Sequence, residues 1–114
     1  MEIKVTKIDD VVLVVLAGEL NMENSNILRE TFKKLLKEMD KKILLDFEKL
    51  AFIDSSGIAT LIEMSQNLVK LNGRMCLCGV NKKIIGVFEV TKVQKLFSIF
   101  ATRQEALRSF CEAR

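Results

Sequence analysis

Hydrophobic and polar residues alternate over residues 4–8, and an almost unbroken apolar run follows over residues 11–17. Alternation at every second position is typical of a strand with one face in solvent, whereas a short apolar run favours a buried strand. Asp9 and Asp10 separate the two segments and have the chemistry of a turn. The chain is therefore predicted to open with a β-hairpin whose second strand is buried and ends at Gly18.

A helical period follows the hairpin. Apolar residues recur at spacings of three and four from Leu28 to Met39, and charged residues occupy the positions between them. This pattern predicts an amphipathic helix, with Asn24 or Ser25 as its N-cap. Residues 43–47 form the next apolar run, so the order strand, helix, strand predicts a parallel pair with a right-handed crossover.

The rest of the chain continues this alternation. Helix, strand, helix, strand and helix are predicted at residues 53–71, 75–78, 84–88, 96–100 and from residue 102. Asn72 and Gly73 supply the stop of the first of these helices, and Thr102 with Glu105 forms a capping box for the last. We predict one α/β domain over residues 1–114, a mixed, mostly parallel five-stranded sheet with about four helices packed on it.

The hydrophobic content and the distribution of charge exclude some classes of function. The 114 residues are 49% hydrophobic, which suits one core. The longest apolar run is far shorter than the roughly 20 residues needed to cross a bilayer, so we expect a cytoplasmic protein without membrane insertion. The net charge of +3 is spread over several lysine pairs rather than one basic stripe, so direct binding of nucleic acid is not expected.

The cysteines are interpreted as structural thiols. Cys76 and Cys78 are two residues apart, so on a strand they share one face, and the odd total of three with Cys111 fits a reducing compartment. A metal site would need further soft ligands, and the chain has no His. No metal is therefore expected.

The stretch Asp54-Ser55-Ser56-Gly57 stands between an apolar run and a long helix. The simplest interpretation is a helix cap, because Asp and Ser oxygens accept the first N–H groups of a helix. A helix N-terminus after a buried strand is also where α/β folds bind anions, and Gly57 would let a backbone or a phosphate approach. Nucleophilic catalysis by a serine is disfavoured because the chain has no His to act as its base.

A helical wheel divides the helix after this stretch into two faces. The predicted core face holds Ile58, Leu61, Ile62, Ser65, Leu68 and Val69. The predicted solvent face holds Ser56, Ala59, Thr60, Glu63, Asn67 and Lys70, flanked by Met64 and Leu71. Such a face is either an ordinary solvated surface or a docking surface for a partner protein.

Nearly the whole chain resembles the STAS domain of bacterial anti-sigma-factor antagonists. The likeness runs from LAGEL at residues 16–20, through ILLDFEKLAFIDSSGIATL at 43–61, to LFSIFATRQEAL at 96–107. In that family an apolar strand leads into Asp-Ser-(Ser/Thr/Ala)-Gly, and an anti-sigma factor that is itself a serine protein kinase phosphorylates the Ser after the Asp. By position that residue is Ser55, and Asp54, Ser56 and Gly57 complete the motif.

Two positions depart from the family pattern. Asn21 stands where phosphorylated members commonly have Asp, and Ile58 and Ala59 stand where many continue the motif as Leu-Gly. The resemblance implies the same α/β fold that the pattern of elements predicts.

The resemblance implies a binding module, not an enzyme. The unmodified domain would bind the kinase and so release a sigma factor, phosphorylation of Ser55 would end that binding, and a PP2C-type phosphatase would reset it. ATP and magnesium would belong to the kinase, so no cofactor is expected here. The chain is expected to be a monomer or weak dimer. The expected partner surface comprises Asn21, Ile58, Ala59, Thr60, Glu63, Met64 and Asn67.

Other roles stay open beside this one. Members of the same fold also serve as accessory subunits of lipid ABC transporters, in which Ser55 would be only a cap, or as stressosome scaffolds without the phosphoswitch. An enzyme or small-ligand binder using Asp46 and Asp54 is disfavoured, because no second catalytic group is evident.

Overall fold

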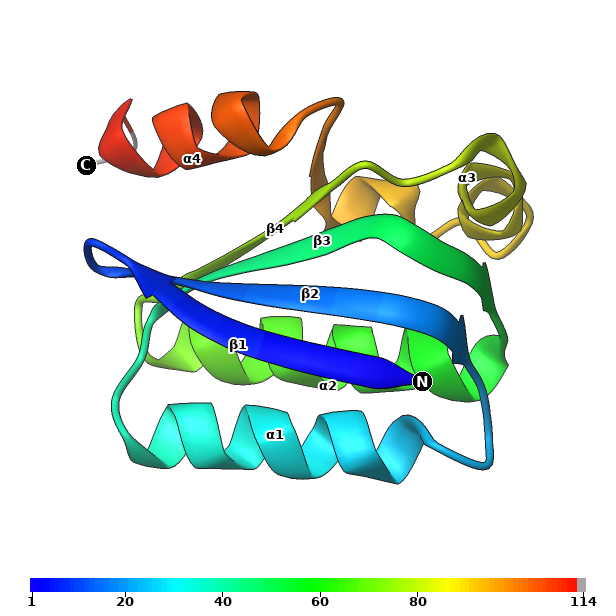
Figure 1. Ribbon diagram of the computed structural model, residues 1–114, viewed down its shortest axis with the longest axis horizontal. Coiled ribbons are helices and arrows are strands. Elements are labelled where there is room, and N and C mark those ends of the chain that lie inside the picture. Colours follow the sequence, from blue (N-terminus) through cyan, green and yellow to red (C-terminus); the bar gives the residue numbers. More distant parts are fainter. Residues whose placement is uncertain (113–114) are drawn as a thin grey trace.

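After an opening hairpin, helices and strands alternate along the chain (Figure 1). The computed structural model describes residues 1–112. The strands are β1 (Glu2–Ile8), β2 (Val11–Leu20), β3 (Lys42–Ile53), β4 (Arg74–Cys78) and β5 (Ser98–Phe100). The α-helices are α1 (Ser25–Lys37), α2 (Ser55–Lys70), α3 (Lys82–Val90) and α4 (Arg103–Glu112), and a short 3-10 helix, η1, spans Gln94–Leu96. The order of strands and α-helices is the one that the sequence predicts.

The strands form one sheet in the order β1-β2-β3-β4-β5. β1 and β2 pair antiparallel through the predicted turn, where Ile8 lies opposite Val11 and Asp9 has a positive φ of 56°. The other neighbouring strands pair parallel. The predicted mixed, mostly parallel five-stranded sheet is confirmed.

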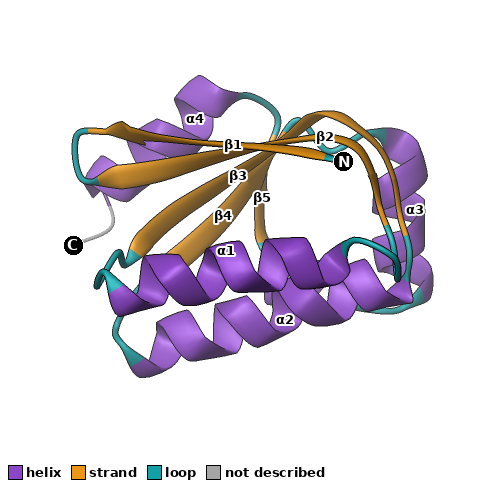
Figure 2. Cartoon of the chain, turned by 60° about the horizontal axis from the view of Figure 1, so that its bottom comes forward, coloured by secondary structure: helices purple, strands orange, loops and turns teal. Residues whose placement is uncertain are grey.

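Helices cover the two faces of the sheet unequally (Figures 1 and 2). α1 and α2 lie side by side along one face, α4 lies over the other, and α3 stands at one end of the sheet. The larger hydrophobic cluster joins the sheet to α1, α2 and α3, and includes the fully buried Leu45, Phe47 and Leu61. The smaller cluster, under α4, consists of Val11, Leu13, Leu44, Cys76, Cys78, Ala106 and Phe110. Most of the hydrophobic stabilisation therefore lies on the side of α1 and α2.

β3 is longer than the sequence predicts. Its apolar run covers residues 43–47, yet the strand continues to Ile53 because it keeps pairing with β2 as far as Leu20 opposite Ile53. Charged Glu48 and Lys49 interrupt the apolar pattern that marked the strand. The extension places the start of α2 beside the end of β2.

The last strand is shorter than predicted. It begins at Ser98, because residues 94–96 form η1 instead of extending the strand. Half of the predicted capping box of α4 is present: the Thr102 hydroxyl accepts the Glu105 N–H at 3.2 Å, while the Glu105 carboxylate accepts from the Thr102 hydroxyl at 3.3 Å instead of from its backbone N–H. The predicted stop of α2 is also confirmed: Asn72 has a φ of 60°, and the Gly73 N–H donates to the Leu68 carbonyl at 2.7 Å.

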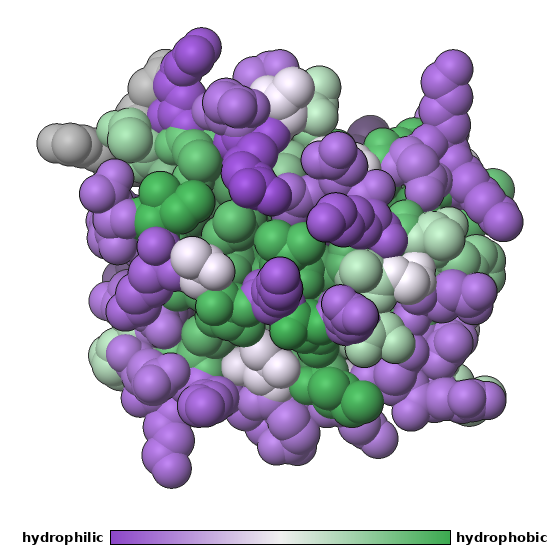
Figure 3. All heavy atoms as spheres, in the orientation of Figure 1, coloured by the Kyte–Doolittle hydropathy of each residue, from purple (hydrophilic) through white to green (hydrophobic). Residues whose placement is uncertain are grey.

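β1 forms one edge of the sheet. On the face shown in Figure 3, hydrophobic side chains reach the surface in the middle and hydrophilic side chains surround them. Val5 of β1 is 47% exposed, while Lys4 and Lys7 of the same strand are also exposed. Lysines on an edge strand oppose pairing with the sheet of a second molecule.

Candidate functional site

Asp54 fixes the entrance to α2. It is the N-cap residue, and its carboxylate oxygen Oδ1 accepts the Gly57 N–H at 3.0 Å. The other oxygen, Oδ2, accepts the Met22 N–H at 2.9 Å, and the Asp54 N–H itself donates to the Leu20 carbonyl at 3.1 Å. Asp54 therefore ties the start of α2 to the loop that connects β2 and α1.

Ser55 is the first residue of α2 and is exposed. Of the two predicted capping residues, Asp54 performs that role, so the Ser55 hydroxyl is not needed for it. Within residues 1–112, no other group forms a hydrogen bond with that hydroxyl. A free hydroxyl consequently stands at the end of a helix where the helix dipole favours negative charge. The neighbouring Ser56 is half-buried.

Gly57 faces inward, contrary to the expectation that it keeps an approach open for a phosphate. It is buried, and a Cβ added there would lie 2.7 Å from both Ile53 Cγ1 and Leu20 Cγ. Carbon atoms in ordinary contact are about 3.5–4.0 Å apart. Glycine is therefore required for close packing of α2 against β2 and β3.

Asn21 organises the loop between β2 and α1. Its side-chain oxygen accepts the Glu23 N–H at 3.0 Å, and its own N–H donates to Asn24 Oδ1 at 2.9 Å. An Asx turn of this kind needs only an acceptor oxygen, which Asn supplies as Asp would. Asn24 occupies the predicted N-cap position of α1 but does not cap the helix with its side chain. Next to Asn21, the Met22 side chain is 74% exposed.

α1 covers much of the α2 face that the wheel assigned to solvent (Figure 2). Thr60 is fully buried and Met64 is 2% exposed, so the expectation that they face solvent is wrong. Ile58 is also buried. The wheel fails because it sorts the residues of one helix by face and cannot show where a second helix packs. Ala59 and Glu63 remain exposed.

Arg29 of α1 holds this face together, a role that no sequence pattern indicates. Its Nε donates to Glu63 Oε2 at 2.7 Å, and its Nη2 donates to the Thr60 hydroxyl at 3.3 Å. The Thr60 hydroxyl in turn donates to the Ser56 carbonyl at 3.0 Å. The chain of contacts joins α1 to the first turn of α2.

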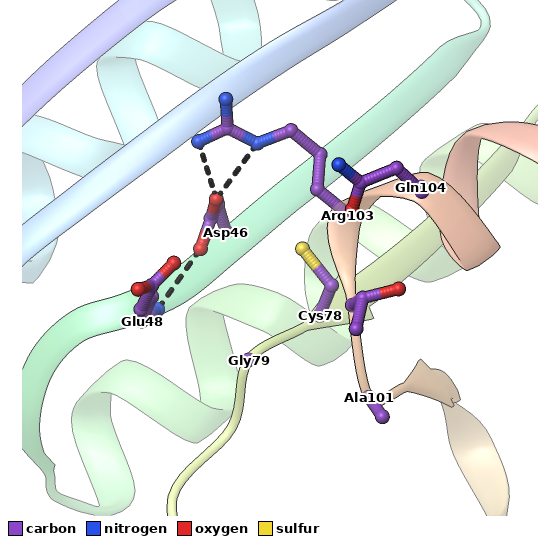
Figure 4. Close-up of a pocket in the computed structure, with 8 residues that line it drawn as sticks. Asp46, Glu48, Cys78, Gly79, Ala101, Arg103 and Gln104 are labelled. Atoms are coloured by element: carbon purple, nitrogen blue, oxygen red, sulfur yellow. Dashed lines mark hydrogen bonds and ion pairs between the residues drawn. The ribbon is translucent and has the colours of Figure 1, made fainter.

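A second polar site lies on the α4 side of the sheet (Figure 4). Asp46, which is 2% exposed, accepts hydrogen bonds on Oδ2 from Arg103 Nη2 at 2.6 Å and Nε at 3.0 Å. Its Oδ1 accepts the Glu48 N–H at 2.9 Å. A cavity of about 470 Å³ opens beside the pair. The hydrogen bond to Asp46 raises the pKa of Arg103, and the ion pair between the two side chains fastens α4 to β3.

Cys76 and Cys78 are buried on one face of β4, as predicted. Burial raises the pKa of both thiols, that of Cys78 to about 12 with a further contribution from the Asp46 charge. Cys111 is exposed. Among residues 1–112, no group of three or more His, Cys, Asp or Glu side chains could hold a metal ion. No helix in that part of the chain is long and apolar enough to cross a membrane.

The chain belongs to the STAS domain family, whose model matches residues 2–106. A protein of Thermotoga maritima named "Putative anti-sigma factor antagonist" is 27% identical over 101 residues, which are 88% of this chain and 89% of that protein. A crystal structure described in the same terms, also from Thermotoga maritima, has a TM-score of 0.89 at 25% identity and covers 94% of this chain and 92% of its own.

Two further solved proteins share the fold. SpoIIAA of Bacillus, described as an anti-sigma factor antagonist, has a TM-score of 0.78 in its unphosphorylated form, at 19% identity, over 99% of this chain and 100% of its own. Its phosphorylated form has a TM-score of 0.75 at 22% identity, over 96% of this chain and 99% of its own. The murine anion transporter solute carrier 26 family member A9 has a TM-score of 0.71 at 27% identity; the match covers 96% of this chain and 19% of the transporter.

Proposed function

We propose that this protein is an anti-sigma-factor antagonist whose binding to a kinase-type anti-sigma factor is switched off by phosphorylation of Ser55. The observation that carries the proposal is the exposed Ser55 hydroxyl, free of hydrogen bonds from the described residues, at the N-terminus of α2. Asp54 performs the capping, so modification of Ser55 leaves the helix start intact. The names of the Thermotoga relatives support the same role.

The proposed docking surface, called here the serine surface, consists of exposed groups around the start of α2. On α2 it includes Ser55, Ala59 and Glu63, and in the neighbouring loop it includes Met22. Met22 supplies an exposed apolar side chain, and its N–H bond to Asp54 fixes its backbone beside the serine. An apolar anchor beside small and polar groups is a common composition of protein interfaces.

Phosphorylation adds charge at the centre of this surface. The Ser55 oxygen attacks the γ-phosphorus of ATP held by the kinase, a new O–P bond forms, ADP leaves, and the hydroxyl proton passes to the kinase base. The product carries a charge of about −1.5 to −2. In the free domain, the α2 N-terminus stabilises such a charge by roughly 0.3–1 kcal/mol.

In the complex the phosphate charge is destabilising instead, because the partner surface would have to bury a dianion where it fits a neutral hydroxyl. A penalty of about 3 kcal/mol would weaken binding roughly a hundredfold. No change of fold is needed for that effect. This chain is then a substrate and not an enzyme, a cytoplasmic monomer or weak dimer that a PP2C-type phosphatase returns to the binding state.

The proposal is tested with purified cognate anti-sigma factor and ATP. Ser55→Ala is expected to bind the partner normally and accept no phosphate, whereas Ser56→Ala is the matched control and is expected to be phosphorylated as the unmodified chain is. Mass spectrometry of the peptide covering residues 52–64 locates the phosphate. A phosphate on Ser56, or tight binding that ATP never weakens, would contradict the proposed switch. Co-purification with a transporter ATPase instead would favour the accessory-subunit role.

The extent of the serine surface has its own test. Ala59 is exposed, so Ala59→Arg should change the free energy of unfolding by no more than about 0.5 kcal/mol while weakening the partner complex. Ala101→Arg, at an exposed position on the α4 side of the sheet, is the matched control and should bind normally. Equal binding by both variants would place the interface elsewhere.

A further inference from the structure

A groove lies between the second half of α2 and η1, away from the serine surface. Its volume is about 480 Å³. Ile62 and Val69 of α2 and Leu96 of η1 supply its apolar side chains, and Lys70 and Lys95 line it as well. Pockets of this size that combine apolar walls with a few polar groups are where proteins bind ligands and peptide segments.

Two of the apolar side chains that line this groove are exposed, whereas Ile62 is half-buried. Val69 is 68% exposed and Leu96 is 56% exposed, although the helical wheel assigns Val69 to the core face of α2. The wheel assignment is wrong for Val69, which lines the groove beside η1 instead of packing in the core. Exposed aliphatic side chains that share one groove are typical of an interaction site.

The charge of the groove is also uncompensated. Lys70 and Lys95 are exposed, and neither forms an ion pair with another residue in the described part of the chain. The residues that line the groove include no Asp or Glu. The complementary occupant is therefore apolar on one side and acidic at its borders.

We propose that this groove binds an acidic amphipathic segment of a partner protein. Ile62 and Val69 are about 10 Å apart along the axis of α2, a length that two turns of a partner helix span. Apolar side chains of the segment at positions i and i+3 or i+4 contact Val69 and Leu96, and its Asp or Glu side chains face Lys70 and Lys95.

The groove and the serine surface are separate sites. Ile62, the nearest residue of the groove, lies about 10 Å from Ser55 along the helix axis, and it points to another side of α2 than its neighbour Glu63 because successive residues turn by about 100°. The charged residue Lys70 lies about 22 Å from Ser55, which exceeds two screening lengths of about 8 Å at physiological salt. Binding in the groove is therefore independent of the phosphorylation state of Ser55. The proposal goes beyond the antagonist role and does not depend on it.

The test uses a fluorescent helical peptide of 12 residues built from leucine and glutamate, and a second peptide with lysine in place of every glutamate. We expect the acidic peptide to bind at least about tenfold more tightly than the basic one, measured by fluorescence anisotropy. Val69→Glu should weaken the acidic peptide at least about tenfold. Val90→Glu is the matched control, because Val90 is 83% exposed on α3 and lies outside the groove, and it should bind as the unmodified protein does.

A double variant, Lys70→Glu with Lys95→Glu, changes only exposed side chains and should reverse the preference between the two peptides. Ser55→Asp should leave peptide binding unchanged, which separates this site from the serine surface. Amide chemical shifts should move in residues 62–70 and 94–96. Equal binding of the two peptides, equal weakening by Val69→Glu and Val90→Glu, no binding at all, or shifts confined to another region would overturn the proposal.

Discussion

Replacement of Gly57 by alanine tests the inward packing at the start of α2. The added Cβ would lie 2.7 Å from Ile53 Cγ1 and from Leu20 Cγ, and 3.0 Å from Leu20 Cδ2. All three neighbours are carbon atoms of side chains that are fully buried, so they have little room to withdraw. Gly86, in the middle of α3, is the matched control because a Cβ added there meets no heavy atom within 4 Å.

Two effects of opposite sign set the expected magnitude. Alanine favours a helix over glycine by about 1 kcal/mol, and this gain applies at both positions. Overpacking of a filled core costs typically about 1–3 kcal/mol, and this cost applies only at Gly57. We therefore expect Gly57→Ala to lower the free energy of unfolding by up to about 2 kcal/mol, because the helix gain offsets about 1 kcal/mol of the overpacking cost, and Gly86→Ala to raise it by about 0.5–1 kcal/mol.

Urea unfolding followed by circular dichroism measures both variants. If Gly57→Ala is as stable as Gly86→Ala, the packing explanation of this glycine is wrong. A folded Gly57→Ala protein should also be phosphorylated at Ser55, since the glycine faces the core. Loss of phosphorylation in a folded variant would show instead that the position serves the approach of the phosphate.

Three further changes have defined expectations. Asp54→Ala removes the cap and the acceptor of the Met22 N–H, and should cost about 2 kcal/mol in urea unfolding, whereas Ser55→Ala should cost less than about 0.5 kcal/mol. Arg103→Ala leaves the buried Asp46 without its cation and should lower the free energy of unfolding by about 2 kcal/mol. This cost is less than for a fully buried pair because the arginine is partly exposed. An unchanged free energy of unfolding would show that the pair does not fasten α4 to β3. Burial raises the pKa of Cys78 from 9.0 to about 12, so the unfolded chain releases this proton first. Stability should be complete below pH 9 and fall as the pH rises towards 12, by about 1.4 kcal/mol per unit, and a stability independent of pH in that range would refute the assignment.

Thiol labelling complements the pH series. In the native state a thiol reagent should modify the exposed Cys111 and should reach Cys76 and Cys78 only after unfolding. Rapid native labelling of either strand cysteine would contradict its burial under α4.

Local sequence patterns were sufficient for the elements and their order. The alternation in residues 4–8, the apolar run in residues 11–17 and the turn at Asp9 and Asp10 depend on neighbours within a few positions. The same holds for the capping box at Thr102 and the stop at Asn72. Such patterns survive in the sequence because each element must present a continuous apolar face to a core. The motif at Asp54 and Ser55 was recognisable for the same reason, since a strand end and a helix start adjoin it.

Contacts between residues far apart in the sequence decided which side chains are exposed and which are buried. Thr60 and Met64 are buried because α1 packs beside α2, whereas Val69 is exposed in the groove beside η1. Arg29 reaches Glu63 across 34 positions, and Arg103 reaches Asp46 across 57.

The sequence of this protein by itself determined its hairpin, its alternating helices and strands, and the position of Ser55 at the N-terminus of α2. Each of these features is set by periodicity and capping within one element. Only the tertiary structure decided which side of α2 meets solvent and why Gly57 must be glycine. Both depend on the relative placement of whole elements. Hydrophobic burial is non-directional, so an amphipathic pattern specifies that a face is covered but not which neighbour covers it.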